Sequence, residues 1–417
     1  MISRTRLWWT FLWLGCIGFG GGIAVLAQIY TLIVQKRGWL KESEYWEAAA
    51  FGQSLPGSYA VNAVSYIGLR LQGTVGAIIA VIAFILPSFF IMLGLTILYR
   101  ELQARQITDL TPLFMAMNAA VVGIVLAVSI KLGRNGIKNY TQAIMAIIAC
   151  SALLLKMLTV VEVILAAGII GIFLNSLKHS EDSAESSSTN SGNVSKSQTE
   201  LSKTDKTSKT DKSIKPSTKT EKRLLLIPLL LLLTPLSLPL LGKIAFLFLR
   251  IGAVTFGGGF VMIPLIEQEV VKNLHWLTHQ QFVDGMALGQ MTPGPVLITA
   301  TFIGYYVASL PGAIVATIAV FLPSLLITII VGHPLERFRT NPQVQAFLSA
   351  VTPTVVGMMG AAFVNINQAG VHSYLGILIA SISCLILLKW RISPALVMLG
   401  AALLGFLLKY FPPAYLN

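Results

Sequence analysis

The chain has 417 residues, of which 55% are hydrophobic and only 11% are charged. Soluble domains carry roughly 25% charged residues, so this composition excludes an ordinary water-soluble enzyme and predicts a membrane protein. The formal net charge of +13 does not indicate a nucleic-acid partner, because basic residues of a membrane protein collect in the loops that stay in the cytoplasm.

The N-terminal segment imitates a secretory signal, because Arg4 and Arg6 precede an apolar run. The same pattern returns at residues 248–264, deep inside the chain. A segment that is repeated in the interior belongs to the fold, so we expect the N-terminus to be retained.

The next feature along the chain is a glycine motif that opens a long internal repeat. Several motifs of the first part return in the same order about 237 residues later: Phe19-Gly20-Gly21-Gly22 as Phe256-Gly257-Gly258-Gly259, Gly52-Gln53 as Gly289-Gln290, Pro56-Gly57 as Pro293-Gly294, and Leu86-Pro87-Ser88 as Leu322-Pro323-Ser324. Two apolar halves with broken helices are typical of secondary transporters, whose substrate site lies where the repeats meet.

Each half contains two apolar regions that glycine or proline interrupts. They span residues 7–34 and 45–70 in the first half and residues 244–271 and 279–306 in the second. Irregular backbone at membrane depth is tolerated where it is buried in protein or lines a cavity. We therefore predict broken helices at these motifs, and the pattern leaves open whether each region crosses the membrane or re-enters it.

Uninterrupted apolar stretches, long enough to cross a bilayer, lie at residues 73–99, 113–130, 224–241 and 311–332. Between the halves, a segment rich in Ser, Thr, Lys and acidic residues cannot bury enough apolar surface to fold. The prediction is an all-α polytopic membrane protein with an N-terminal repeat at 1–177, a disordered polar linker at 178–223 and a C-terminal repeat at 224–417.

The loop with Lys131, Arg134 and Lys138 is basic, whereas its repeat counterpart at 365–372 carries no Lys or Arg. Short basic loops stay in the cytoplasm, so the two equivalent loops are expected on opposite sides of the membrane, which makes the halves inverted repeats. The stretch at 224–241 has no counterpart and supplies the odd crossing. The basic residues Arg100 and Arg105 fall outside in this arrangement and count against it.

A chain that breaks and restarts as a helix presents free N–H groups and the positive end of a dipole, which suits an oxyanion. The broken motifs and nearby polar side chains are therefore candidate substrate-binding residues. They are Gly20, Gly21, Gly22, Pro56, Gly57, Ser58 and Asn62 in the first half and Gly257, Gly258, Gly259, Gln290, Thr292, Pro293, Gly294 and Pro295 in the second. The alternative is that these glycines only allow close helix packing.

Arg250 is the candidate for attracting the anion, because a guanidinium in an otherwise uncharged apolar stretch is costly and its planar donors suit an oxyanion. The equivalent residue of the first half is Trp13. A carboxylate beside an anion path must be protonated or paired, so we expect either proton coupling or an ion pair with Arg250, and a solvated loop end is the alternative. The carboxylates concerned are Glu47 and Asp284, at equivalent positions, and Glu267 and Glu269.

The three cysteines, Cys16, Cys150 and Cys384, are widely spaced, which predicts neither a disulfide framework nor a metal site. His275 and His279 stand four residues apart but have no third ligand nearby in the sequence. We expect no metal and no cofactor.

Three motifs of the second half are specific: Arg250-Ile-Gly-Ala-Val-Thr-Phe-Gly-Gly-Gly259, then Glu267-Gln-Glu269, then Asp284-Gly-Met-Ala-Leu-Gly-Gln290-Met-Thr-Pro-Gly-Pro295. Their combination resembles the chromate ion transporter family, and the resemblance covers both halves outside the linker. It implies a bacterial inner-membrane protein that moves chromate, commonly outward, and so gives chromate resistance. The first half departs from the family pattern, because Gly22 stands where a proline is frequent and Ser58 replaces the second proline of Pro-Gly-Pro.

The chain lacks the GxxxxGK[S/T] motif of P-loop ATPases, so we expect secondary transport. The leading prediction is export of chromate, with proton coupling as one option. Transport or exchange of sulfate, a dianion of the same shape, or of another inorganic anion is the alternative. An intramembrane enzyme is a remote alternative, because it would need a nucleophile–base pair or a metal cluster that the scattered histidines and cysteines do not supply.

Overall fold

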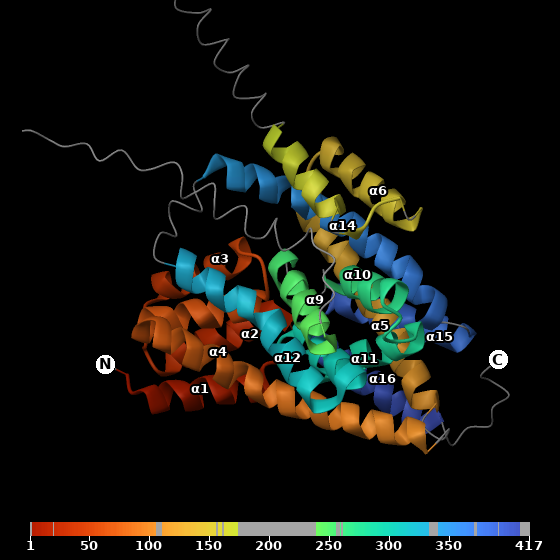
Figure 1. Ribbon diagram of the computed structural model, residues 1–417, viewed down its shortest axis with the longest axis horizontal. Helices are drawn as coiled ribbons and strands as arrows, with labels where there is room; N and C mark the ends of the chain where they lie inside the picture. Colours follow the sequence, from red (N-terminus) through yellow and green to blue (C-terminus); the bar gives the residue numbers. More distant parts are fainter. Residues whose placement is uncertain are drawn as a thin grey trace, which may run out of the picture.

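The computed structural model describes residues 2–19, 21–105, 111–155, 157–160, 162–173, 239–255, 259, 262–332, 341–370, 373–390 and 392–408. Within these residues every regular element is a helix, as the sequence predicts (Figure 1). The first half holds α1 (Arg4–Ile17), α2 (Gly21–Ile29), η1 (Tyr30–Lys36), α3 (Glu42–Ser54), α4 (Tyr59–Ala104), α5 (Thr111–Gly136), α6 (Tyr140–Leu154) and a helix at Glu162–Phe173. The second half holds α9 (Leu240–Val254), α10 (Met262–Ile266), η4 (Glu267–Asn273), α11 (His279–Met291), η5 (Val296–Ile298), α12 (Thr299–Val331), α14 (Pro342–Gly370), α15 (Tyr374–Lys389) and α16 (Pro394–Leu408).

The first interrupted region of each half is a helical hairpin. In the first half, α2 and the π-helix η1 run back beside α1, because the guanidinium of Arg37, just after η1, donates to Thr10 Oγ1 of α1 at 2.5 Å. In the second half, η4 lies beside α9 in the same way, because Arg250 of α9 and Glu269 of η4 are 3.4 Å apart. At 1.5 Å per residue, the 14 residues of α1 cover about 21 Å, less than the ~30 Å bilayer core. Helix α1 alone is therefore too short to cross the bilayer core.

The second interrupted region is also a hairpin, formed by α3 and the first arm of α4, residues 59–71. The Asn62 amide donates to the carbonyl of Gly52 at 3.4 Å, and Arg70 pairs with Glu44 at 3.6 Å, so the two helices run in opposite directions. In the second half α11 and the first arm of α12, residues 299–307, form the same hairpin. Both hairpins have the shape expected of re-entrant segments, one of the two arrangements that the sequence leaves open, and the choice between the two stays a prediction.

Helix α4 bends sharply between its first arm and its second arm, residues 74–104. Gln72 and Gly73 leave the helical conformation, and Gly73 has φ +64°. The arms touch through backbone, since a Cβ on Gly68 would lie 2.4 Å from the carbonyl oxygen of Gly76. Helix α12 bends in the same way at Ala308 and Ser309, before its second arm at residues 310–331.

The two long second arms are antiparallel. Gly332, which follows the second arm of α12, packs on Leu69 at the close of the first arm of α4. At the other end, the Tyr306 hydroxyl of α12 donates to Gln103 Oε1, near the end of α4, at 3.2 Å. Equivalent helices that run side by side in opposite directions (Figure 1) are the arrangement of an inverted repeat, as the charge pattern of the loops predicts.

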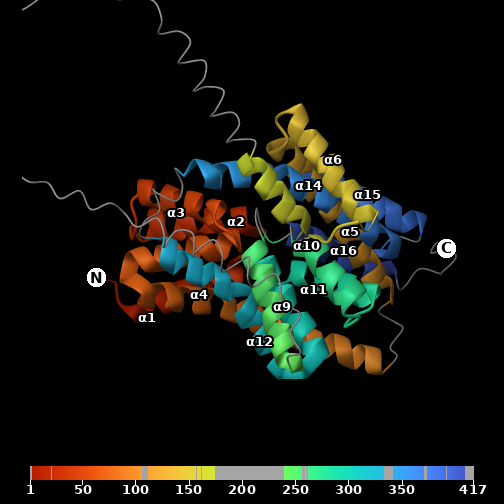
Figure 2. The same cartoon turned by 45° about the horizontal axis from the view of Figure 1, so that its top comes forward.

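Glycine contacts hold the helices together in matching pairs. Within the halves, α1 lies along α4 and α9 along α12 (Figure 2), and the positions where a Cβ would strike the neighbouring helix are Gly15 in α1 and Gly252 in α9. Between the halves, Gly123 of α5 meets the backbone of Ala380 in α15, and Gly357 of α14 meets the backbone of Ala146 in α6. Such small-residue contacts let helices approach closely in a membrane.

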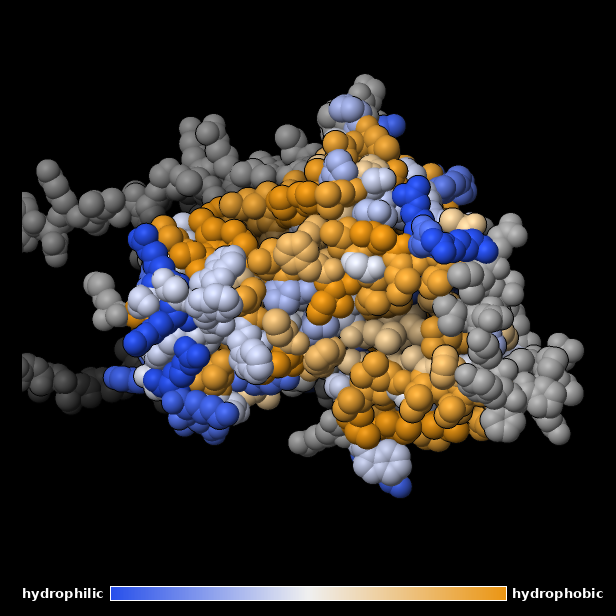
Figure 3. Space-filling model, turned by 90° about the horizontal axis from the view of Figure 1, so that it is seen from below, coloured by the Kyte–Doolittle hydropathy of each residue, from blue (hydrophilic) through white to orange (hydrophobic). Residues whose placement is uncertain are grey.

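The outer surface fits a bilayer. Among the described residues four helices are long and apolar enough to span it, at Tyr59–Ala104, Pro112–Arg134, Val296–Val331 and Pro342–Asn367, and four shorter helices are also apolar. The face shown in Figure 3 is broadly apolar, with hydrophilic residues gathered toward its margins. The predicted spans at 73–99, 113–130 and 311–332 fall in these helices. The predicted linker at 178–223 and most of the stretch at 224–241 lie outside the described residues.

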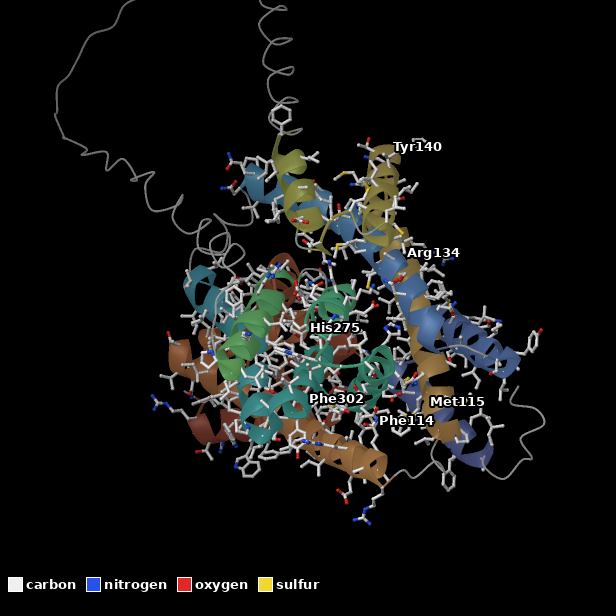
Figure 4. The ribbon with its side chains drawn as sticks, turned by 45° about the vertical axis from the view of Figure 1, so that its right-hand side comes forward. Phe114, Met115, Arg134, Tyr140, His275 and Phe302 are labelled. Carbon is white, nitrogen blue, oxygen red and sulfur yellow. The ribbon has the colours of Figure 1, made fainter. Side chains whose placement is uncertain are left out.

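Tyr140 and Tyr374 offer a direct test of the inverted arrangement. They begin the equivalent helices α6 and α15, and their side chains are 92% and 86% exposed. In a variant without native cysteines, we expect Tyr140→Cys and Tyr374→Cys to react with a membrane-impermeant maleimide from opposite sides of the membrane. Labelling of both from one side would refute the inverted repeat. Figure 4 labels Tyr140 at the start of α6, and Arg134 and Met115 near the two ends of α5.

Candidate functional site

The tips of the hairpins meet at the centre of the molecule and bind each other across the halves. The N–H of Gly57, in the first Pro-Gly loop, donates to the carbonyl oxygen of Thr255 at 2.6 Å. The N–H of Gly294, in the second Pro-Gly loop, donates to the carbonyl oxygen of Gly18 at 2.8 Å. These are repeat-equivalent bonds, so each proline-glycine tip closes on the glycine-motif hairpin of the other half.

Both glycines of these tips are constrained twice. Gly57 has φ +106° and Gly294 has φ +103°, in the region that L side chains rarely adopt. A Cβ on Gly57 would also lie 2.0 Å from Ser324 Oγ, and one on Gly294 would lie 2.1 Å from Ser88 Oγ. Only glycine fits at these two positions, because backbone and serine hydroxyl come into direct contact there.

Ser88 and Ser324 are site residues that the sequence interpretation missed. They end the repeated Leu-Pro-Ser motif, which marks a proline inside each long arm and gives no sign that its serine reaches the opposite half. The sequence marks these serines only as a polar residue that both halves repeat within an apolar stretch. Both side chains are fully buried, and the Ser58 N–H donates to Ser324 Oγ at 3.1 Å.

Buried polar atoms without a hydrogen-bond partner gather around the tips. Within the described part of the chain they include Ser88 Oγ, the amide nitrogen of Gln290 and the amide oxygen of Asn62. Ser88 and Gln290 can donate hydrogen bonds, and the first turns of α4 and of η5–α12 begin beside them with their N–H groups facing the tips. An unpaired buried polar group costs free energy, so these donors fit a ligand that accepts hydrogen bonds.

The glycine motifs pack against the first turn that follows the proline-glycine tip of the same half. A Cβ on Gly22 would lie 2.8 Å from the Tyr59 ring, and one on Gly259 would lie 3.0 Å from Val296 Cβ. Gly21 begins α2. The candidates Gly20, Gly257 and Gly258 lie outside the described residues. Of the remaining tip candidates, Thr292 donates to the carbonyl of Leu288 at 2.9 Å, while Pro56, Pro293 and Pro295 lie in the tip loops themselves.

Arg250 forms an ion pair with Glu269, one of the two roles that the sequence leaves open. The guanidinium and the carboxylate are 3.4 Å apart, with 19% and 13% of their side chains exposed, and Arg250 Nε has no hydrogen-bond partner among the described residues. The first half has Trp13 and Leu32 at the equivalent positions and no ion pair. There a cleft of about 290 Å³ opens, lined by Trp13, Ile17, Ala27, Gln28, Thr31, Leu32 and Lys36.

Glu267 is a second ionisable residue of η4 that contacts a basic side chain. It is 1% exposed, and its Oε1 lies 3.5 Å from Lys272 Nζ and 3.6 Å from His279 Nδ1. The other ring nitrogen of His279 contacts the carbonyl of Asn365 at 3.2 Å. η4 and its equivalent η1 are π-helices, a rare form that recurs at functional sites and that the sequence interpretation does not anticipate.

The structure separates the equivalent carboxylates Glu47 and Asp284. The Glu47 side chain is 39% exposed, accepts a hydrogen bond from Tyr66 and lies 4.0 Å from Arg70. Asp284 is 4% exposed and accepts hydrogen bonds from Tyr99, Asn118 and Gln280. No Lys, Arg or His lies within ion-pair distance of Asp284 among the described residues. The two positions therefore differ in charge environment although the repeat relates them.

The described residues contain no group of three or more His, Cys, Asp or Glu side chains that could hold a metal ion. In particular His275 and His279 are not joined by a third ligand in the part of the chain that the structure covers. The arrangement at the tips offers neutral hydrogen-bond donors and helix N-termini, which is the chemistry of oxyanion binding.

A family model described as chromate transporter matches residues 5–172 and 242–406, which together cover most of the chain and both halves. The chain belongs to the chromate transporter family. A chromate transport protein from Cupriavidus metallidurans is 29% identical over 95% of this chain and 90% of its own length. A probable chromate transport protein from Synechococcus elongatus is 31% identical over 94% of this chain and 92% of its own length. No solved structure matches.

A shorter relative matches one part of this chain. An uncharacterized transporter from Bacillus subtilis, YwrA, is 33% identical over 154 residues, which are 36% of this chain and 86% of the relative. In the two-half chromate transporter both copies are joined, so each can diverge, as Arg250 opposite Trp13 shows.

Proposed function

We propose that this protein is a secondary transporter that carries chromate out of the cell across the bacterial inner membrane and thereby gives chromate resistance. The observation that carries the proposal is the meeting of four hairpin tips from both halves, with buried unpaired donors beside them, in a chain of the chromate transporter family. A tetrahedral dianion presents oxygen atoms on all sides and so can accept hydrogen bonds from both halves at once.

Neutral donors favour release as well as binding. A full countercharge at the tips would hold a dianion too firmly, whereas hydroxyl, amide and backbone N–H groups replace its hydration shell at moderate strength. In this proposal the substrate-binding residues are Gly57, Ser58, Asn62, Gln290, Thr292 and Gly294, with Ser88 and Ser324 added from the structure. Arg250, held by Glu269, raises the local concentration of anions beside the tips.

The distribution of cations supports an orientation for the protein. The open ends of the first-half hairpins carry Arg4, Arg6, Lys36, Arg37, Lys41 and Arg70, whereas the described open ends of the second-half hairpins carry Lys243 and Lys272. By the positive-inside rule the first-half hairpins open to the cytoplasm and the second-half hairpins open to the outside. Chromate then passes from one set of hairpins to the other by rocking of the halves.

Sulfate or another inorganic anion remains the alternative substrate, because its geometry and charge match those of chromate.

The experiment that tests the proposed function uses everted membrane vesicles, in which export becomes uptake. We expect labelled chromate to accumulate when respiration acidifies the interior, with a protonophore preventing accumulation if protons are the coupling ion. Stronger accumulation of sulfate than of chromate at equal concentration would favour the alternative. No accumulation of either anion, with normal uptake in right-side-out vesicles, would reverse the direction. Accumulation of either anion that depends on this protein would also argue against the remote alternative of an intramembrane enzyme.

A further inference from the structure

The strongest unexplained feature outside the tips is the buried carboxylate of Asp284. It lies on α11, with α4, α5, α12, α14 and α16 packed around that helix. Its side chain accepts three hydrogen bonds: from the Tyr99 hydroxyl to Oδ2 at 2.6 Å, from the Asn118 amide to Oδ1 at 2.7 Å and from the Gln280 amide to Oδ1 at 3.0 Å. Tyr99 and Asn118 belong to the first half and Asp284 to the second.

All three donors are neutral, and the surrounding helices bring no compensating cation. The described parts of α14 and α16 contain no ionisable side chain. The ionisable side chains of the other helices do not pair with Asp284. On η4 and α11, Glu267, Glu269, Lys272 and His279 interact with one another or with Arg250. The others are Lys131 and Arg134 at the far end of α5, the exposed Arg100 and Glu101 on α4, and Tyr305 and Tyr306 on α12. An ionisable residue buried in a membrane protein without a partner marks an ion or proton pathway.

Asn118 allows this site to hold the carboxyl group in either protonation state. The Asn118 side chain is buried, and its Oδ1 has no hydrogen-bond partner among the described residues. When Asp284 is charged, the amide nitrogen of Asn118 donates to it. When Asp284 carries a proton, rotation of the amide by half a turn presents Oδ1 as the acceptor, so the O–H group is also satisfied.

Tyr99 connects Asp284 to the surface. Its ring is held between Phe114 of α5 and Phe302 of α12, with ring centres 5.4 Å and 5.5 Å away, and both phenylalanines are labelled in Figure 4. The hydroxyl accepts from the exposed Gln103 at 2.7 Å, and Gln103 in turn accepts from Tyr306. A single hydrogen-bonded chain thus joins the buried carboxylate to the open end of the second-half hairpins.

The equivalent position in the first half lacks these properties. Glu47 is partly exposed and lies 4.0 Å from Arg70, and the residue equivalent to Arg70 in the second half is the neutral Tyr306. A carboxylate beside a permanent cation stays charged through a transport cycle, because the cation favours the charged form. The carboxylate without a cation can exchange its proton.

We propose that Asp284, with Tyr99, Asn118 and Gln280, is the proton-binding site that couples anion movement to the proton gradient. This rests on the proposed transport function. A proton enters from the open end of the second-half hairpins and binds the carboxylate, which becomes a neutral carboxyl group. Tyr99 and Asn118 move with one half and Asp284 with the other, so the rocking that carries the anion one way also changes these contacts. Where the halves separate them, the carboxylate has fewer donors and binds the proton; where they meet again, the donors favour the charged form and the proton leaves to the opposite side.

The test compares Asp284→Asn with Glu101→Gln, a control that neutralises an exposed carboxylate two residues from Tyr99. Two activities are measured in everted vesicles with labelled chromate: accumulation driven by an acid interior, and exchange against unlabelled chromate in the absence of any gradient. Exchange needs the anion site and no net proton movement. We expect Asp284→Asn to lose acceleration by the pH gradient while keeping exchange, and Glu101→Gln to keep both.

The outcomes separate the proposals. If Asp284→Asn still responds to the pH gradient, the proton site lies elsewhere and this inference is wrong. If a correctly folded Asp284→Asn, judged by size-exclusion chromatography, loses exchange as well, Asp284 serves anion translocation itself and the coupling role is likewise wrong. If the unsubstituted protein shows no chromate exchange, the proposed function fails independently of Asp284. Asn118→Leu supplies a second check, because removing the amide nitrogen and oxygen should shift the pH at which accumulation is half-maximal and leave exchange in place.

Discussion

Gly294→Ala is expected to abolish chromate transport. The added methyl group meets two obstacles at once: φ of +103°, which costs an alanine about 1–3 kcal/mol, and an approach of 2.1 Å to Ser88 Oγ, so that the Ser88 side chain, the tip loop or α4 must shift. A shift of the loop or of α4 breaks the hydrogen bond from the Gly294 N–H to the carbonyl of Gly18, and with it the contact between the tips of opposite halves. Transport by the vesicles described above is the measurement.

Gly38→Ala and Gly73→Ala separate the two obstacles. Both positions have positive φ, +59° and +64°, but a Cβ there would meet nothing within 4 Å. They carry the backbone strain without the collision, so we expect both variants to transport chromate. Ser88→Gly added to Gly294→Ala removes the atom that the methyl group strikes and should return the melting temperature toward that of the unsubstituted protein. Normal transport by Gly294→Ala alone would show that the tips are packing devices and that the anion passes elsewhere.

Much of the fold could be predicted because each local motif occurs in both halves, so that each copy supports the interpretation of the other. One Phe-Gly-Gly-Gly or one Pro-Gly motif is ambiguous, since glycine serves packing and chain reversal equally well. Two copies in the same order fix the broken segments, and the contrast between Lys131–Lys138 and its neutral counterpart gives the inversion. These features are encoded within a few residues, which is why sequence suffices for them.

The contacts between halves could not be predicted, because nothing in the sequence says which surfaces of the copies meet. Ser88 reaches Gly294 only because α4 of one half lies against the tip of the other. The difference between Glu47 and Asp284 is equally invisible, since it depends on Arg70 beside one carboxylate and on Tyr99 and Asn118 beside the other. Distances between segments far apart in sequence decide both.

The two halves differ in function although they derive from one repeat. The tips keep the symmetry, with matching glycines, matching serines and matching backbone hydrogen bonds, because the anion must be passed between equivalent surfaces. The charges do not keep it: the second half alone has Arg250 with Glu269, Glu267 with Lys272, and an unpaired buried carboxylate. We infer that the symmetric tips form the path of the anion. The charged residues of the second half attract the anion and bind the proton that is coupled to its movement.

Arg250→Gln is the second substitution with a large expected effect, and it acts on stability and on transport. It leaves the largely buried Glu269 carboxylate without its partner, which lowers the free energy of unfolding by about 3 kcal/mol. It also removes the cation that attracts chromate toward the tips. Arg105→Gln is the matched control, because Arg105 forms a pair with Glu101 at 2.8 Å on the surface, where an ion pair contributes about 1 kcal/mol or less.

The double variant Arg250→Gln with Glu269→Gln decides between the two roles of the arginine. Neutralising Glu269 removes the unpaired charge, so the melting temperature should recover. Chromate transport should stay low, because the recovered fold still lacks a cation near the anion path. Arg250→Lys should fall between, since it keeps the charge but loses the planar donors that hold Glu269. If the double variant regains chromate transport together with its stability, Arg250 serves only as the partner of Glu269, and the anion is drawn to the tips by their neutral donors and helix N-termini alone.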